Sequence, residues 1–348
     1  MKIVPLITIL LTFSVLSLTG DAIPSSSASR KLKISELDYY VNTDEGRAIL
    51  EEDFNGIKEG ERKSWTRAVL PENLKKNRYN SLDVLPFDET RVVLENLPND
   101  PYSDYINANY VNGEHSEKEY VAAQGPLPNT IDDFWRMIWQ LNSTKIVMLT
   151  NLVEHGERKV EKYWPEETDK YGNITVTLIS QHEFLKIHHV VRTFSVEKEG
   201  ENTTRIIRHF HYTGWPDLSV PVDRLSVVAL IQQTRKYKPD NKVPIVLHCS
   251  AGVGRTGTVI LTDSMMQKAE AEGIVDFPAK LDHMRVQRVD VVEKKEQYIF
   301  AHQAVYDFFA GGDTDDYLRN VNEEYKIIDQ SATDTESTEE NSYRSPQG

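Results

Sequence analysis

The sequence predicts one α+β domain over roughly residues 34–310. Segments rich in β-branched and aromatic residues gather between residues 105 and 211, which favours a sheet. Amphipathic helical patterns dominate from residue 222 to residue 309. No internal repeat is present, and a length of 348 residues allows one large domain or two ordinary ones. We expect one domain in which helices cover a central sheet.

The first half of this domain begins with helices and continues with strands. From Ile34 onward, apolar residues recur at steps of three and four, which predicts helices before residue 58. Alternating patterns predict strands over 105–111 and 120–126, and a short apolar run predicts a third over 145–150. Between them, Thr130 is a candidate N-cap for a helix over 131–141.

The second half contains an antiparallel region and then several helices. Residues 174–211 read as strands interrupted by a polar turn at 197–202, where Gly200 can adopt a positive φ. Helices are predicted over 222–238, 256–272, 280–286 and 294–309, and a buried strand over 243–248. Gly273 is placed to end the helix that precedes it.

The two ends of the chain differ from the domain in composition. Residues 1–22 read as a cleaved signal peptide, with a basic Lys2, an apolar core over 3–18 and small residues at 19–22. The core is shorter than the roughly 20 residues of a membrane span, so we expect a secreted protein without stable membrane insertion; an uncleaved signal anchor is the alternative. Residues 23–33 predict a flexible linker, and 311–348 an acidic, Ser- and Thr-rich disordered tail. The sequons at Asn142, Asn173 and Asn202 are compatible with a secreted glycoprotein.

Composition excludes several classes of function. A formal net charge of −14 argues against nucleic acid or an anionic membrane as a general partner. The single cysteine excludes an intramolecular disulfide framework and a cysteine-rich zinc site. His209 and His211 share one face of a predicted strand, but no third metal ligand stands at suitable spacing. No nucleotide-binding glycine motif is present either. From these observations together we expect no metal and no cofactor. The sequence predicts no particular oligomeric state.

The strongest chemical feature is a loop that follows the apolar run 243–247. It contains Cys249, the only cysteine, and Arg255, with five residues between them. Backbone N–H groups of such a loop can converge on one anion, and the arginine adds a planar fork suited to phosphate oxygens. A helix N-terminus and a guanidinium also favour a thiolate over a thiol. The loop therefore predicts a phosphate cradle with a sulfur nucleophile on its floor.

The stretch His248-Cys249-Ser250-Ala251-Gly252-Val253-Gly254-Arg255-Thr256-Gly257 resembles the signature of the classical protein tyrosine phosphatases. The resemblance implies the cysteine-phosphatase fold, with a highly twisted mixed central sheet flanked by helices. It implies that Cys249 attacks phosphorus to form a phosphocysteine, while Arg255 and the amides of residues 250–254 bind the phosphoryl oxygens. Thr256 would donate its hydroxyl to the departing thiolate.

Other positions match the same family. Trp215-Pro216-Asp217 resembles its mobile acid loop, which implies that Asp217 protonates the leaving phenolic oxygen and then deprotonates water. Tyr79 resembles the tyrosine that stacks on phosphotyrosine and excludes shorter phosphoserine. Glu154 would pair with Arg255, and Lys159 would approach Asp217 when the loop closes.

This chain also departs from the family pattern. Glu293 stands where the family usually has a glutamine that positions the hydrolytic water, whereas Gln297 matches the second glutamine and is assigned to substrate binding. Val289 and Asp290 replace a usual Pro-Gly-like pair, and the loop 80–85 is two residues longer than usual. An ionised Glu293 about 5 Å from a phosphate charge would cost roughly 3 kcal/mol at an effective dielectric near 20. The carboxyl could instead take up a proton or turn outward.

The leading hypothesis is a secreted protein tyrosine phosphatase acting on phosphotyrosine-containing proteins or peptides. The alternative is a phosphotyrosine-binding pseudophosphatase whose turnover is impaired by Glu293. A phosphatase for another phosphate ester is a third possibility, because the longer loop 80–85 alters the mouth of the site.

Overall fold

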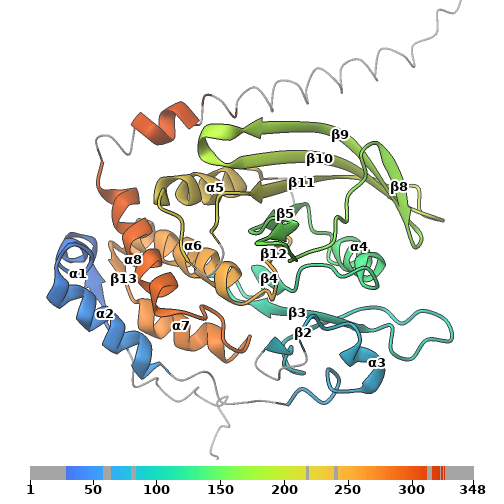
Figure 1. Ribbon diagram of the computed structural model, residues 1–348, viewed down its shortest axis with the longest axis horizontal. Coiled ribbons are helices and arrows are strands. Elements are labelled where there is room, and N and C mark those ends of the chain that lie inside the picture. Colours follow the sequence, from blue (N-terminus) through green and yellow to red (C-terminus); the bar gives the residue numbers. More distant parts are fainter. Residues whose placement is uncertain are drawn as a thin grey trace, which may run out of the picture.

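A nine-stranded mixed sheet forms the centre of the molecule (Figure 1). The computed structural model describes residues 29–57, 64–79, 84–216, 219–238, 242–311, 316–321, 323 and 325. The strand order is β2-β3-β4-β12-β5-β11-β10-β9-β8. The strands are β2 (Arg91–Val93), β3 (Tyr105–Val111), β4 (Tyr120–Ala123), β5 (Lys145–Met148), β8 (Thr168–Tyr171), β9 (Ile174–Phe184), β10 (His189–Lys198), β11 (Thr204–Tyr212) and β12 (Ile245–His248).

Strand β12 lies in the middle of this sheet. It is parallel to both neighbours, β4 and β5, and β5 is parallel to β11, whereas the outer strands pair in antiparallel fashion. All four residues of β12 are buried, which is why its sequence is an apolar run rather than an alternating pattern. The predicted phosphate cradle therefore begins at the carboxyl end of the central strand.

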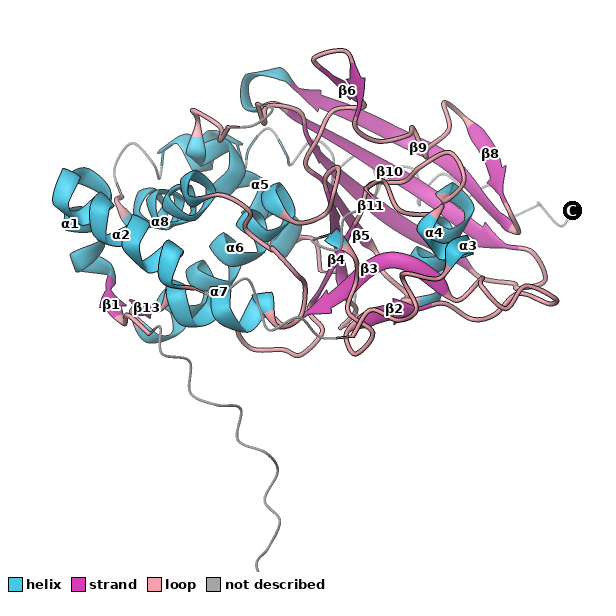
Figure 2. Cartoon of the chain, turned by 60° about the horizontal axis from the view of Figure 1, so that its bottom comes forward, coloured by secondary structure: helices cyan, strands magenta, loops and turns pink. Residues whose placement is uncertain are grey.

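Helices cover both faces of the sheet. The helices are α1 (Leu37–Asn42), α2 (Asp44–Gly56), α3 (Pro71–Leu74), α4 (Ile131–Gln140), α5 (Arg224–Lys236), α6 (Gly254–Glu272), α7 (Phe277–Arg285) and α8 (Lys295–Phe309). Figure 2 shows α1, α2 and α5 to α8 gathered on one side of the sheet and α4 on the other. The prediction of a mixed central sheet flanked by helices is confirmed.

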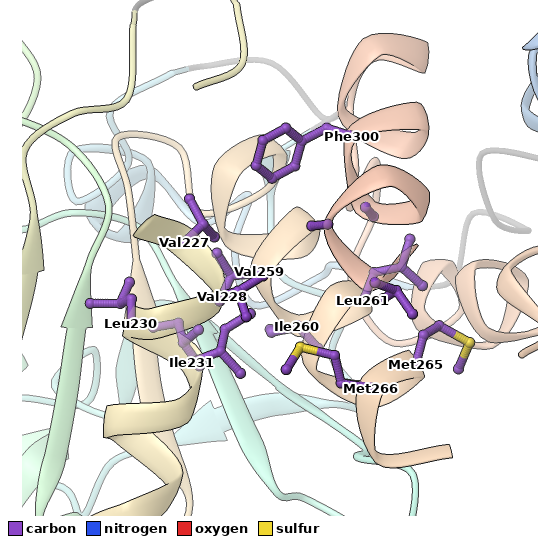
Figure 3. Close-up of a cluster of buried hydrophobic side chains, with 14 of the residues drawn as sticks. Val227, Val228, Leu230, Ile231, Val259, Ile260, Leu261, Met265, Met266 and Phe300 are labelled. Atoms are coloured by element: carbon purple, nitrogen blue, oxygen red, sulfur yellow. The ribbon is translucent and has the colours of Figure 1, made fainter. Parts of the chain in front are cut away.

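Two apolar cores follow from this layering. Leu247 of β12 belongs to the core shared with α5, α6 and α8, whereas Val246 belongs to the core beside α4. Figure 3 shows side chains of the first core, among them Val227 and Ile231 of α5, Val259 of α6 and Phe300 of α8. This core fixes α6, whose first turn carries the cradle arginine.

Most predicted elements are confirmed, with boundaries moved by a few residues. The helix after Thr130 ends at Gln140, and α5 begins at Arg224 because the Asp223 side chain accepts a hydrogen bond from Ser226 N. Gly273 ends α6 with a φ of 70°, as predicted. The break between β9 and β10, where Leu185–Ile187 form a 3₁₀ turn, was not located from the sequence.

The prediction of a flexible linker over 23–33 is wrong for its described part, residues 29–33. Strand β1 (Leu32–Lys33) pairs with β13 (Ile274–Val275), and Arg30 forms an ion pair with Asp53 at 2.6 Å. Residues 23–28 lie outside the described residues. This segment is held by pairing with β13 and by both carboxylate oxygens of Asp53. The composition of residues 29–33 gives no sign of either contact.

The prediction of a disordered tail from residue 311 is also wrong for its described part. Residues 316–321 are helical, and Leu318, Val321 and Tyr325 are buried. The Tyr325 ring stacks on Phe184 at 4.4 Å, and its hydroxyl lies 2.7 Å from His189 Nδ1. Three apolar residues in an acidic segment are too few to produce a recognisable helical stripe.

The remaining calls on the chain ends are not tested. The predicted signal peptide, residues 1–22, lies outside the described residues. Within the described ranges, no helix combines the length and apolarity needed to cross a membrane.

Replacing Tyr325 with alanine is expected to lower the free energy of unfolding by about 2–3 kcal/mol, because it removes a stacked, buried ring and leaves His189 Nδ1 unpaired. Urea denaturation of the full chain measures this loss. Arg319→Ala, on the exposed side of the same segment, is the matched control. A change below about 0.5 kcal/mol, the range typical of surface sites, would show that the segment does not pack in solution.

Candidate active site

The predicted cradle lies between the end of β12 and the start of α6. It forms the floor of a cavity of about 460 Å³, and Cys249 is 5% exposed there. Gly252 N–H donates to Cys249 Sγ at 3.2 Å. Gly252 has a φ of 75°, and a Cβ atom on it would lie 2.1 Å from Ala123 O, so only glycine fits. The backbone therefore turns a donor toward the sulfur, as an anion site requires.

Arg255 is held in the first turn of α6 by a carboxylate. Glu154, on the hairpin of β6 (Val153–Glu154) and β7 (Glu157–Arg158), accepts from Arg255 Nη1 and Nη2 at 2.7 Å each. Burial opposes ionisation of Glu154, but hydrogen bonds from Arg255, Asn151 N and Thr150 Oγ1 outweigh it and hold the pKa of Glu154 below its ordinary value. This bidentate pair fixes the plane of the guanidinium beside the cavity.

Arg288 supports the cradle from below, and its role was not predicted. Its Nε donates to Gly252 O at 2.6 Å, and Nη2 donates to Ala251 O at 3.0 Å. Nη1 and Nη2 also donate to Asn109 and Asn107 Oδ1 at 2.8 and 3.1 Å. The side chain is fully buried, which lowers the pKa of Arg288 to about 10, so it stays charged at neutral pH. By binding two carbonyls on the outside of the loop, it leaves the amides facing inward.

The predicted substrate-binding residues line the same cavity. Tyr79 is 42% exposed at its mouth, and its hydroxyl lies 3.5 Å from Ser250 Oγ. Lys159 also lines the cavity, and its Nζ lies 3.1 Å from Glu157 Oε2. Residues 80–83 of the long loop lie outside the described residues, so its effect on the mouth stays a prediction.

The acid loop brings its two ends to the cavity. Trp215 is buried, and its Nε1 donates to Ser219 O at 3.0 Å, while Pro216 O lies 3.5 Å from Arg255 Nη2. Ser219 lines the cavity. Asp217 itself lies outside the described residues, and its role as proton donor, like the approach of Lys159 to it, stays a prediction.

Glu293 is exposed and lines the cavity, with its carboxylate beside the cradle. A Cβ atom on Gly254 would lie 3.1 Å from Glu293 Oε2 and 2.8 Å from Gln297 Nε2. Gln297 Oε1 is engaged elsewhere, because it accepts from the backbone N–H groups of Glu293 and Lys294. The sequence left three possibilities open for Glu293; its side chain lines the cavity, and its effect on turnover stays a prediction.

Two neighbours complete the site. Thr256 is buried, and its Oγ1 has no hydrogen-bond partner in the described part of the chain, so the hydroxyl is available for the predicted donation to the thiolate. His248 is buried beside Cys249, with Nδ1 3.2 Å from Cys249 O. Across the described ranges, no group of three or more His, Cys, Asp or Glu side chains could hold a metal ion.

Asp290 shows how the chain accommodates the change from a Pro-Gly-like pair. It adopts a φ of 50°, a conformation that glycine enters freely and that aspartate tolerates better than most other residues. Val292, two residues on, has a φ of 60° and is fully buried. Its N–H donates to Val253 O at 3.3 Å, so this strained turn is tied to the back of the cradle.

Replacing Arg288 with methionine is expected to weaken the binding of vanadate, a phosphate analogue, by about 100-fold, because it leaves the carbonyls of Ala251 and Gly252 unpaired and frees the loop amides. Competition with a fluorescent ligand or calorimetry measures the affinity, and circular dichroism checks folding. Arg288→Lys keeps the charge without the planar fork of donors, so its vanadate affinity should fall between those of wild type and Arg288→Met. Wild-type vanadate affinity in Arg288→Met would contradict this role.

Comparison with known proteins agrees with the geometry. Residues 73–307 match the protein-tyrosine phosphatase family model. The chain is 38% identical over 288 residues to a tyrosine-protein phosphatase Lar-like of Caenorhabditis elegans, covering 82% of this chain and 13% of the relative. It is 40% identical over 273 residues to receptor-type tyrosine-protein phosphatase S of Gallus gallus, covering 78% and 18%. The chain thus spans less than a fifth of these relatives. It belongs to the protein-tyrosine phosphatase family.

Proposed function

We propose that this protein hydrolyses phosphotyrosine in proteins or peptides through a phosphocysteine intermediate. The observation that carries the proposal is the arrangement around Cys249: a sulfur on the floor of a cavity, an amide donor at 3.2 Å and a guanidinium fixed beside it by Glu154. Such a site can bind the phosphoryl group of the substrate and present the sulfur to phosphorus.

The reaction has two steps. In the first, the Cys249 thiolate attacks phosphorus, the bond from phosphorus to the tyrosine oxygen breaks, and Asp217 gives its proton to that oxygen. In the second, water attacks the phosphocysteine, Asp217 takes a proton from the water, and the sulfur leaves as a thiolate with a hydrogen bond from Thr256. Arg255 and the loop amides bind the equatorial oxygens, on which charge accumulates in both transition states.

Tyr79 sets the substrate class. Its half-exposed ring stands at the mouth of the cavity, above Ser250, where it can stack on an aromatic phosphoester. A phosphoserine side chain is too short to span from the mouth to Cys249. The site therefore favours phosphotyrosine over aliphatic phosphate esters, the third possibility raised by the sequence.

Glu293 governs how fast the intermediate is released. Its carboxylate lies over Gly254 of the cradle, where it repels the phosphoryl charge and where a glutamine would otherwise orient water. The retained Cys249, Arg255 and Asp217 favour an enzyme over a pseudophosphatase that only binds. We infer that formation of phosphocysteine is fast and its hydrolysis slow.

Wild-type protein is expected to turn over a phosphotyrosyl peptide with a burst of product, up to one equivalent, followed by a slower steady state. Glu293→Gln should raise the steady-state rate about tenfold, because it removes the repulsion and restores an amide that can position water. Stopped-flow detection of the dephosphorylated peptide, through the change in tyrosine fluorescence, measures both phases, with a phosphoseryl peptide as the substrate control for phosphate release.

Cys249→Ser is the control for the nucleophile and should abolish both phases. If wild-type turnover does not exceed that of Cys249→Ser, the protein is not a phosphatase and the pseudophosphatase alternative holds. Equal steady-state rates in wild type and Glu293→Gln would show that Glu293 does not limit hydrolysis.

We infer further that the chain is secreted and N-glycosylated. The signal-like pattern of residues 1–22 supports entry into the secretory pathway. The three sequon asparagines lie in turns: Asn142 and Asn202 are exposed, and Asn173 is partly exposed between β8 and β9. Asn142 and Asn173 line one surface hollow, and the β10–β11 turn is linked to Asn173 by Glu199 N–H.

Expression of the full chain in a secretion-competent eukaryotic cell should yield protein in the medium that begins near residue 21 or 23 and shifts in mobility after glycosidase treatment. Asn142→Gln, Asn173→Gln and Asn202→Gln should each remove one step of that shift. Recovery of full-length, unglycosylated protein in the cytosol would overturn secretion.

A further inference from the structure

A buried chain of hydrogen bonds joins strand β10 to the peptide of the nucleophile. Arg192 Nη1 lies 3.3 Å from His209 Nδ1, and His209 Nε2 lies 2.8 Å from the Tyr163 hydroxyl. That hydroxyl lies 2.8 Å from His248 Nε2, and His248 Nδ1 lies 3.2 Å from Cys249 O. The four side chains are at most 7% exposed. No step of the proposed mechanism uses Arg192 or His209.

The direction of each bond follows from the carbonyl at the end. Cys249 O can only accept, so His248 carries its proton on Nδ1. Burial lowers the pKa of His248 to about 4, so the ring is neutral and its Nε2 has no proton. His248 Nε2 must therefore accept, and the Tyr163 O–H donates to it.

Tyr163 has one proton but two imidazole neighbours. Since that proton goes to His248, His209 Nε2 must donate to the Tyr163 oxygen, and its Nδ1 must accept. Burial holds the pKa of His209 well below its ordinary value, so this ring is also neutral. Arg192 can only donate, and it donates to His209 Nδ1. If Arg192 were absent, His209 could change tautomer and compete with His248 for the tyrosine proton.

A second histidine supports this assignment independently. His211 Nε2 lies 2.8 Å from Thr150 O, which can only accept, and burial lowers the pKa of His211 to about 3, so the ring is neutral and its Nδ1 is unprotonated. The same Arg192 Nη1 lies 3.4 Å from that Nδ1. The His-x-His pair on β11, which the sequence offered as a weak metal site, thus presents two acceptors to one guanidinium.

The buried guanidinium of Arg192 differs from most buried cations in its partners. Within the described residues, no carboxylate forms an ion pair with it; its Nε donates to Gln181 Oε1 at 2.7 Å, and the guanidinium lies 4.4 Å from the Trp164 ring. Glu183 and Glu166 act on it only through space, and burial lowers its pKa to about 10, so it remains charged. A buried cation without a carboxylate partner is costly, and hydrogen bonds that begin at a charged donor polarise the bonds beyond it.

We propose that Arg192 is a positioning residue for the phosphatase reaction: by donating to His209 Nδ1 it reserves the Tyr163 proton for His248, whose Nδ1–H then holds the Cys249 carbonyl. The proposal rests on the proposed function for its effect on catalysis. Cys249 O packs closely against Gly125, where a Cβ atom would lie 2.4 Å from it. A rotated Cys249 peptide would move the sulfur and the first cradle amides away from their common centre.

The test uses the full chain and two readouts. The first is the rate at which iodoacetamide alkylates Cys249, measured against pH; it needs no substrate and reports on the nucleophile even if the protein is no phosphatase. The second is kcat/KM for a phosphotyrosyl peptide. Arg192→Met should shift the midpoint of alkylation upward by about one pH unit and lower kcat/KM about tenfold. Gln181→Ala removes a partner of Arg192 that is not part of the hydrogen-bond series from Arg192 to Cys249. This variant is the matched control and should match wild type in both readouts.

The decisive variant carries two changes. His209→Phe removes the competing acceptor, so adding it to Arg192→Met should restore the alkylation midpoint toward wild type. If the two substitutions acted only by disturbing packing, their effects on the midpoint would add instead. Arg192→Lys, which keeps a charged donor, should retain most of the activity. Should Arg192→Met fail to fold, Tyr163→Phe deletes the proton itself and should give the same shift. An unchanged alkylation profile in Arg192→Met, or further loss in the double variant, would overturn the proposal.

Discussion

The site depends on one constraint: the amides of a tight loop must all face one point, so its carbonyls must be bound on the outside. Arg288 satisfies two of these carbonyls, those of Ala251 and Gly252, from a fully buried position. His248 Nδ1–H lies beside a third, that of Cys249. Each interaction removes the cost of an unpaired buried carbonyl and at the same time sets the direction of the amides. The proposed anion site therefore depends on the hydrogen bonds that bind the outward-facing carbonyls of the loop.

The surrounding fold makes these contacts possible. Because β12 is the central parallel strand, its carboxyl end has β4 and β5 on its two sides, and the cradle is contacted from the α7–α8 connection and from the β6–β7 hairpin. Arg288 reaches it from the first of these and binds Asn107 and Asn109 of β3 on the way. The hairpin with Glu154 fixes Arg255 from the open side. The α7–α8 connection, strand β3 and the β6–β7 hairpin thus meet around the loop of residues 249–255.

Local chemistry in the sequence predicted the nucleophile loop, the Gly273 stop and the residues that line the cavity, because each depends on neighbours in the chain or on a family motif. The role of Arg288 could not be predicted, since nothing near it in sequence shows that its guanidinium lies under Gly252. The docking of residues 29–33, 316–321 and Tyr325 was missed for a related reason: their partners, which include Asp53, Asp276 and His189, are far away in sequence. The orientation of Glu293 likewise depends on Gly254, 39 positions earlier.

The central claim is that Cys249 carries the phosphoryl group between two chemical steps. Acid-quenching the wild-type protein during steady-state turnover of a phosphotyrosyl peptide, followed by proteolysis and mass spectrometry, tests it most directly. The account predicts the mass of one phosphoryl group on the peptide that contains Cys249, in most of the molecules, because hydrolysis is the slow step. Product formation with no phosphoryl group on Cys249, or with the group on another residue, would contradict it.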